Sequence, residues 1–189
     1  MIPLYQSEKY KVHVGEGSSV GFCTAWNEPE LVFKRSAVLR KKARIVGTLY
    51  SRQGVNIILR NLALNPEIRK LVLWANGPLS NTQFGKAGWS LLKKMWEEGI
   101  ASDGTVAGTN FKIEKEIDVG VVEKMRSAVA FVDESVRDFE DVEERVEKIE
   151  HESGAYMVPT AFPEAIPEKV GTFPSEEVGW LIRGSGVLD

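Results

Sequence analysis

The stretch Ala43–Ile100, ARIVGTLYSRQGVNIILRNLALNPEIRKLVLWANGPLSNTQFGKAGWSLLKKMWEEGI, predicts strand, loop, helix, strand, loop and helix in that order. Its first seven residues, Ala43–Leu49, form a short apolar run. Apolar residues then recur at the spacing of one helix face: Val55, Ile58, Leu59 and Leu62. Asn65-Pro66 ends this helix, because the residue before a proline avoids the helical conformation.

The second half of the stretch repeats the pattern. Lys70–Ala75 is too short for a helix and continuously apolar, which favours a parallel strand covered on both faces. The helix that follows has an apolar side and ends at Gly99 as a C-cap. Its inward residues are expected to be Phe84, Gly88, Leu91, Leu92 and Met95. Two strands joined by a helical crossover lie parallel, so the sequence predicts an α/β fold with a mostly parallel sheet.

Ligands of such sheets bind beyond the carboxyl ends of the strands, which directs attention to the loops Thr48–Gln53 and Asn76–Gln83. We expect the two strands to be neighbours and their loops to open on the same edge. The candidate ligand-binding residues carry hydroxyl and amide groups: Thr48, Ser51, Gln53, Asn76, Ser80, Asn81, Thr82 and Gln83. Ordinary turn and N-cap hydrogen bonding is the alternative explanation for these residue types.

Composition limits the function further. The chain has 189 residues and 43% hydrophobic content, enough for one good core. A net charge of -3 without a basic stripe argues against nucleic acid as a partner. No apolar run reaches the roughly 18 to 20 residues of a membrane span. The single cysteine, Cys23, excludes an internal disulfide, and we predict a cytoplasmic protein.

Before this stretch, Val20–Trp26 is predicted to be the first core strand, with Cys23 buried as a small hydrophobe. Asn27 is expected to cap a helix starting at Glu28-Pro29. Its inward residues are expected to be Leu31, Val32 and Val38. The helix ends in basic residues that either complement its dipole or bind a phosphate or a partner: Arg35, Arg40, Lys41, Lys42 and Arg44.

After the stretch, Phe111–Ile117 alternates apolar and charged residues, which predicts a half-exposed edge strand. Ala128–Val132 is predicted as a buried strand ending at Asp133, which either caps the next helix or binds a ribose or magnesium. Ser135–Glu152 is predicted as an acidic amphipathic helix. Its apolar stripe is Val136, Phe139, Val142, Val146 and Ile149.

The composition changes at Gly154, where four prolines within about twenty residues predict an extended strap or linker. Val178–Leu188 again predicts a strand, which either opens a further domain or pairs with the N-terminal segment. We therefore divide the chain into an α/β domain, 1–153, and a strap or linker, 154–189, that leads toward a separate catalytic domain.

Motifs of catalysis are absent from the sequence. The two histidines, His13 and His151, have no companions at metal-ligand spacing, so no metal site is predicted. There is no phosphate-binding loop, no dinucleotide-binding glycine pattern and no nucleophile elbow. The chain is thus not expected to be catalytic alone.

Over about half the chain, however, a run of signals resembles a known family. These signals are Gly47 and Gly54, Asn65–Arg69, Glu98–Ile100, Asp103-Gly104, Gly108, and Val119–Arg126 with the strand into Asp133. They resemble the soluble domain of the methyl-carrying component of tetrahydromethanopterin S-methyltransferase, and the related domain found beside pterin-binding modules in archaea. The resemblance implies a Rossmann-like three-layer sandwich, to which this chain adds the acidic helix and the proline-rich strap. The methyl-carrying component binds a corrinoid through a histidine in the loop after the second strand, and the corresponding loop here, Asn76–Gly85, has none.

A second resemblance concerns architecture. Val178–Asp189 looks like the opening strand of the catalytic domain of archaeal thymidylate synthase-type proteins, whose catalytic cysteine motif this chain lacks. Together the resemblances imply an accessory domain in one-carbon and dTMP metabolism that binds a pterin or a nucleotide, or that docks to its catalytic domain. The alternatives are a corrinoid-binding methyl-transfer protein, and a dimerisation or interaction module without a small-molecule ligand.

Overall fold

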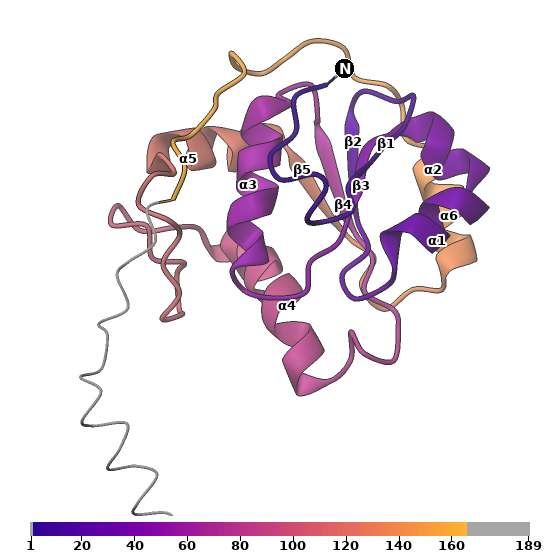
Figure 1. Cartoon of the computed structure of the whole chain (residues 1–189), viewed down its shortest axis with the longest axis horizontal. Helices are drawn as coiled ribbons and strands as arrows, with labels where there is room; N and C mark the ends of the chain where they lie inside the picture. The colour runs from indigo at the N-terminus through magenta and orange to yellow at the C-terminus, as the bar shows by residue number, and fades with distance from the viewer. Residues whose placement is uncertain (1, 166–189) are drawn as a thin grey trace, which may run out of the picture.

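A five-stranded sheet forms the centre of the computed structural model, which describes residues 2–165 (Figure 1). The strands are His13–Val14 (β1), Val20–Cys23 (β2), Ala43–Gly47 (β3), Lys70–Leu73 (β4) and Ala130–Asp133 (β5). Their order in the sheet is β1-β3-β2-β4-β5. β1 pairs antiparallel with β3, and the other pairs are parallel. This confirms the predicted α/β class with a mostly parallel sheet.

The expectation that the two strands of the stretch are neighbours is wrong. β3 and β4 run parallel, but β2 lies between them and pairs with both. All four β2 residues are buried, as expected for a strand that has neighbours on both sides and helices on both faces. The chain therefore places β3 on one side of β2 and then crosses to place β4 on the other side. The direction in which strands are added to the sheet reverses at this point, between β2 and β4.

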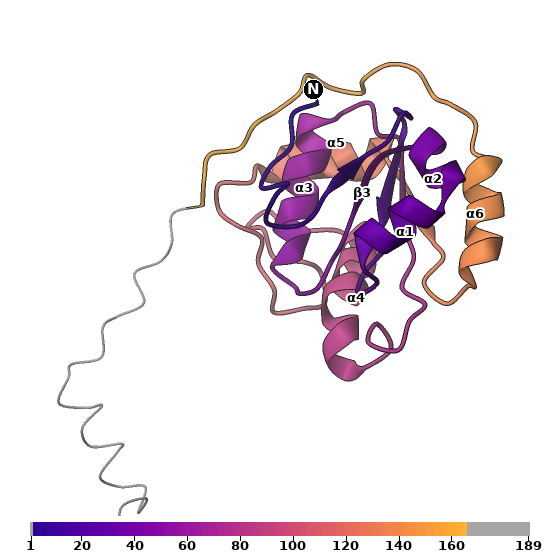
Figure 2. The ribbon, with the colours of Figure 1, turned by 45° about the vertical axis from the view of Figure 1, so that its right-hand side comes forward.

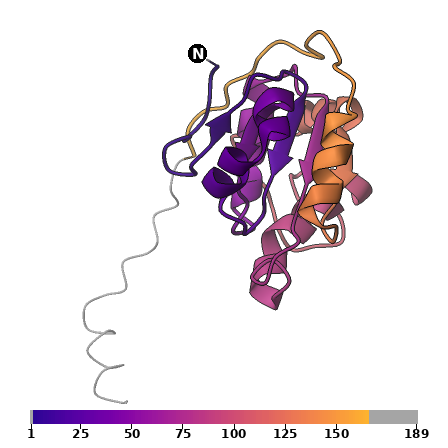
Figure 3. The same cartoon turned by 90° about the vertical axis from the view of Figure 1, so that its right-hand side faces the viewer.

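Helices cover both faces of the sheet (Figures 1 and 2). The helices α1 (Pro29–Arg35), α2 (Ala37–Lys42) and α6 (Phe139–Glu147) share one apolar cluster with one face, and this layer is turned to the viewer in Figure 3. The helices α3 (Gly54–Leu64), α4 (Gln83–Glu98) and α5 (Val119–Ala128) share a larger cluster with the opposite face.

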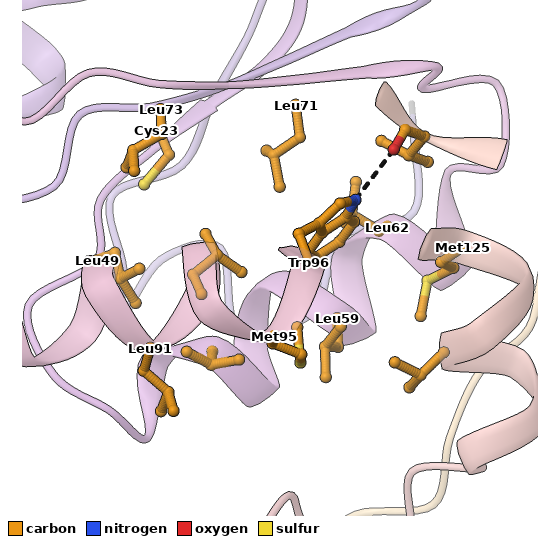
Figure 4. Packing of buried hydrophobic residues seen from close by; sticks show 14 of the residues in the cluster. Cys23, Leu49, Leu59, Leu62, Leu71, Leu73, Leu91, Met95, Trp96 and Met125 are labelled. Carbon is orange, nitrogen blue, oxygen red and sulfur yellow. Dashed lines mark hydrogen bonds between the residues drawn. The ribbon is translucent and has the colours of Figure 1, made fainter. Parts of the chain in front are cut away.

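The larger cluster contains a buried, hydrogen-bonded tryptophan of α4. Trp96 lies among Leu71 of the sheet and Leu62 of α3, and its ring nitrogen donates to the carbonyl oxygen of Val129 at 3.0 Å (Figure 4). A buried indole needs such an acceptor, so this bond fixes α4 against the residue that precedes β5.

The first helical region differs from its prediction, because Ser36 divides it into α1 and α2. Ser36 ends α1 with an extended backbone and caps α2 by accepting a hydrogen bond from the Leu39 backbone nitrogen at 2.9 Å. Leu31, expected inside, is 66% exposed, whereas Val32 is buried. Asn27 does not cap α1, since Glu28 takes that position.

Two of the five residues of the basic cluster bind carbonyl groups at or just beyond the ends of helices, and binding of a phosphate or a partner stays a prediction. Arg40 donates to the carbonyl oxygens of Phe33 and Lys34 at the end of α1. Lys42 donates to the carbonyl oxygen of Ile149 at 3.1 Å. Carbonyl groups at helix ends lack partners within the helix, and these side chains supply them.

Two other predicted elements within residues 2–165 differ in the structure: one strand is absent, and the acidic helix is shorter than predicted. Phe111–Ile117 is not a strand: only Lys112 makes an isolated bridge, to Thr105. Its apolar residues do turn inward, but they pack on the α3 side of the core without a strand partner. The acidic helix begins at Phe139, because Ser135 donates to Asp133 in a turn that leaves Val136 80% exposed.

The strand into Asp133 forms as predicted but is less buried than its apolar sequence suggests. β5 is the last strand on its side of the sheet and pairs only with β4. Its residues are therefore exposed or half-buried, and Phe131 packs on the Trp96 ring with the two centroids 5.8 Å apart.

The first part of the proline-rich region is an extended strap along α3. The backbone nitrogens of Tyr156 and Thr160 donate to the carbonyl oxygens of Pro66 and Ala63, at 3.2 and 2.8 Å. The predicted strand Val178–Leu188 lies outside the described residues. None of the helices within residues 2–165 is long and apolar enough to cross a membrane.

Candidate functional site

A strained turn follows the central strand. Ala25 has a φ of 49° and no exposed surface, although only glycine adopts such backbone angles easily. Its carbonyl oxygen accepts hydrogen bonds from the Leu49 backbone nitrogen at 3.0 Å and from the Thr48 hydroxyl. These two bonds hold the loop after β2 against the loop after β3. Backbone strain of this kind concentrates at functional sites, which makes this edge a candidate.

The turn places Trp26 at the centre of an aromatic group. Its ring centroid lies 4.9 Å from that of Tyr50 and 5.3 Å from that of Phe84, with the ring planes tilted by 56° and 59°. We call these three residues the rim cluster. Tyr50 comes from the loop after β3 and Phe84 from the first turn of α4, which follows the loop after β4. Phe84, which the helical spacing predicts to face inward, is instead 70% exposed, so one large ring of the cluster is open to solvent.

Glycines allow the three loops to approach one another. A Cβ atom on Gly88 of α4 would lie 2.8 Å from the carbonyl oxygen of Ser51. A Cβ atom on Gly77 would lie 2.5 Å from the side-chain oxygen of Asn27. Gly88 faces backbone, so glycine is required there, whereas a side chain at position 77 would require the Asn27 side chain to move. The two predicted loops therefore open on the same edge of the sheet, and the β2 loop lies between them.

Three of the predicted residues already have hydrogen-bond partners, and for Thr48 and Asn76 these partners lie in other loops. Thr48 donates to Ala25, and the side-chain oxygen of Gln53 accepts from Asn56 at 3.0 Å. Asn76 donates to the carbonyl oxygen of Arg137 at 3.0 Å and to the Asp138 carboxylate at 3.2 Å. Asn76 thus faces the loop after β5, away from the loop after β3.

Three more residues organise the turn before α4. Ser80 is fully buried and its hydroxyl accepts from the Trp26 backbone nitrogen at 3.3 Å. Asn81 donates to the carbonyl oxygen of Gly77 at 3.2 Å, and Thr82 caps α4 by accepting from Gly85 at 2.9 Å. These are the turn and N-cap roles that the sequence offered as the alternative.

The remaining two predicted residues, Ser51 and Gln83, are exposed beside the rim cluster. They are the immediate chain neighbours of Tyr50 and Phe84. An exposed amide is thus next to the Phe84 ring in the chain, and an exposed hydroxyl is next to Tyr50. Sequence reasoning missed the three rings, although Trp26 is the last residue of the first predicted strand.

A second, more acidic hollow of about 410 Å³ lies beyond the end of β5, lined by Asp133, Ser135, Val136, Arg137, Asp138 and Asp141. Burial alone would raise the pKa of Asp133, but hydrogen bonds from Lys93 and Ser135 outweigh it and lower that pKa. The Lys93 ammonium lies 2.5 Å from the Asp133 carboxylate. The Lys93 ammonium therefore compensates the negative charge of the Asp133 carboxylate. No group of acidic, histidine or cysteine residues within 2–165 is arranged to hold a metal ion.

Cys23 is buried, as the sequence predicts, with 3% of its surface exposed. Burial raises the pKa of its thiol to about 12. Only the thiolate is an effective nucleophile, so this side chain is inert at neutral pH.

Comparison with known proteins adds no assignment to this geometry. No protein-family model matches the chain, and no curated protein matches it either. The rim cluster and its neighbours therefore define the candidate site by their geometry alone.

Proposed function

We propose that the chain is an accessory ligand-binding domain with a Rossmann-like architecture, which serves an archaeal thymidylate synthase-type protein in one-carbon metabolism. The ligand is a flat heteroaromatic molecule, a pterin or a nucleotide, held at the rim cluster. The observation that supports this most directly is the exposed Phe84 ring packed on Trp26 at the carboxyl edge of the sheet. In open α/β sheets, ligands bind at this edge where the strand order reverses, and that point lies beside β2.

Stacking on Phe84 would supply most of the affinity. An aromatic side chain contributes about 1–3 kcal/mol per stacked base, whatever the base. The exposed amide of Gln83 and hydroxyl of Ser51 would hydrogen-bond the polar edge of the ring. The Trp26 ring nitrogen has no hydrogen-bond partner within residues 2–165, and it would donate to a ligand acceptor once the side chains that shield it from solvent move aside.

Calorimetric titration with a tetrahydropterin and with dUMP tests the proposal. We expect saturable binding of one of them, weakened about tenfold or more by Phe84→Ala. Leu79→Ala is the matched control, because Leu79 is also an exposed apolar residue, at 58%, and lies outside the rim cluster. Lack of binding by both ligands would refute the proposal, and so would equal affinity in the Phe84 variant. Cobalamin, titrated in parallel by absorbance, tests the corrinoid alternative.

A further inference from the structure

A separate apolar pocket of about 60 Å³ lies between the sheet and α3. Its floor contains Gly21 and Cys23 of β2 and Ile45 and Gly47 of β3. In the parallel register Gly21 pairs with Ile45 and Cys23 pairs with Gly47, so the two glycines sit diagonally on one face. We call this space the glycine pocket.

The backbone does not explain both glycines. Neither Gly21 nor Gly47 is among the residues with positive φ. A Cβ atom on Gly47 would meet only a methyl group of Val12, at 3.8 Å, which is an ordinary contact. The register shift beside Gly21 gives a local reason for glycine at that position. At Gly47, neither a steric clash nor the backbone conformation requires glycine. Gly47 is the last residue of β3, and a glycine in a strand often marks a bulge, a bend, or a site that a ligand or another backbone approaches closely.

Two polar side chains that line the glycine pocket, Asn61 and Thr48, already have partners. The Asn61 amide donates to the carbonyl oxygens of Tyr5 and Ile57, and accepts from the Tyr5 backbone nitrogen. The Thr48 hydroxyl donates to Ala25. The pocket therefore favours an apolar group, since a polar group would lose its hydration there without compensation.

The size and the position of the opening limit the ligand. The volume is less than half of the roughly 150 Å³ cavity that holds benzene, so it admits a chain end rather than a ring. The partly exposed lining residues mark the opening, between the N-terminal segment and α3: Tyr10, Val12, Thr48, Ile57 and Ile58. We propose that the glycine pocket binds the end of an unbranched alkyl group carried by a small neutral molecule.

Methyl-group NMR with 1-butanol tests this inference, and 1,4-butanediol is the matched control because both of its ends are polar. We expect saturable shifts of the Ile45, Ile58 and Leu71 methyl signals with 1-butanol and none with the diol. Gly47→Leu should abolish these shifts by filling the pocket, and Gly47→Ala should weaken binding about fourfold for one methylene of lost space.

Each other outcome overturns the inference. Unsaturable shifts, or equal shifts with the diol, would show a packing void or non-specific solvent action. Shifts that persist in a folded Gly47→Leu variant would place the alcohol elsewhere. If Gly47→Leu does not fold, unchanged affinity in Gly47→Ala has the same meaning. Phe84→Ala should leave the shifts intact, so this inference and the proposed function fail separately.

Discussion

Arg60 joins four parts of the chain. This α3 residue is 2% exposed, and its guanidinium donates to the Glu114 carboxylate at 2.8 and 2.9 Å. It also donates to the carbonyl oxygen of Pro163 in the strap at 2.7 Å, and lies over the ring of Tyr5 at 4.8 Å. A buried cation is tolerated when its donors are satisfied, and the hydrogen bonds of Arg60 engage most of its N–H groups.

Arg60→Ala is therefore expected to lower the free energy of unfolding by about 3–5 kcal/mol, because the Glu114 carboxylate loses its partner. Arg60→Lys should recover little, since an ammonium cannot make the same forked contacts. Urea denaturation measures both. Arg52→Ala is the control. Like Arg60, Arg52 donates to a side-chain oxygen, that of Asn110, and lies over an aromatic ring, that of Phe111, but it does so at the surface. A loss no larger than that of the control would contradict the joining role of Arg60.

The Cys23 thiol gives a second prediction at this scale. Its pKa is raised to about 12 by burial, so the folded protein should resist iodoacetamide at pH 8.5. The unfolded chain ionises this thiol near its ordinary pKa of 9.0, so the stability contribution is complete below that pH and is lost as the pH rises above it. Mass spectrometry of the alkylated protein, with and without urea, measures the labelling of this thiol. Rapid labelling without urea would show an accessible thiolate.

Among the elements, the break between α1 and α2 is the most sensitive to one side chain. Ser36 caps α2 and also donates to the Glu143 carboxylate of α6 at 2.5 Å. Ser36→Ala should cost about 1–2 kcal/mol of stability, because a buried cap and its partner are lost together. Thermal unfolding checks this, with the exposed Ser127→Ala in α5 as the control. Equal unfolding temperatures for the two variants would rule out a structural role for the cap.

The elements also show what the sequence can predict. Continuous apolar runs located the parallel strands β2, β3, β4 and β5, because strands between two helical layers carry that signal. The same runs do not encode which strand is central, so the placement of β2 between β3 and β4 was missed. The rim cluster depends on that placement, since Trp26 meets Tyr50 and Phe84 only across loops distant in sequence. The sequence also predicts ligand-binding roles for polar residues that serve in turns and caps, such as Ser80, Asn81 and Thr82. Turns, caps and ligand contacts use the same side chains, so the sequence alone does not separate them.

For the molecule as a whole, acid stability should depend on the carboxylates whose pKa is lowered in the folded protein, which among residues 2–165 include Glu30, Asp103, Asp133 and Glu152. Hydrogen bonds and charge from Lys70 lower the pKa of Glu152, and the pKa of Asp133 is also lowered. Stability from such groups is present above the unfolded pKa values, near 3.8 and 4.5, and is lost as the pH falls through the lower folded values. Urea midpoints should therefore drop below about pH 4.5.

The double variant Asp133→Asn, Glu152→Gln should make this drop smaller, because these two neutral side chains no longer take up protons on unfolding, whereas Glu30 and Asp103 still do. Glu147→Gln, on the exposed side of α6, is the matched control and should leave the profile unchanged. If the double variant and the wild type lose stability in parallel with falling pH, other groups control the acid transition.

The meeting of the strap with the N-terminal segment has a mechanical consequence. The Tyr5 hydroxyl donates to the Glu164 carboxylate at 2.7 Å, so two points near opposite ends of the described chain touch. A force pulling residues 5 and 164 apart would load the Arg60 contacts first and the parallel strands only later. In an optical trap, the strap should peel away in a small early step, and the sheet should rupture in a separate step at higher load.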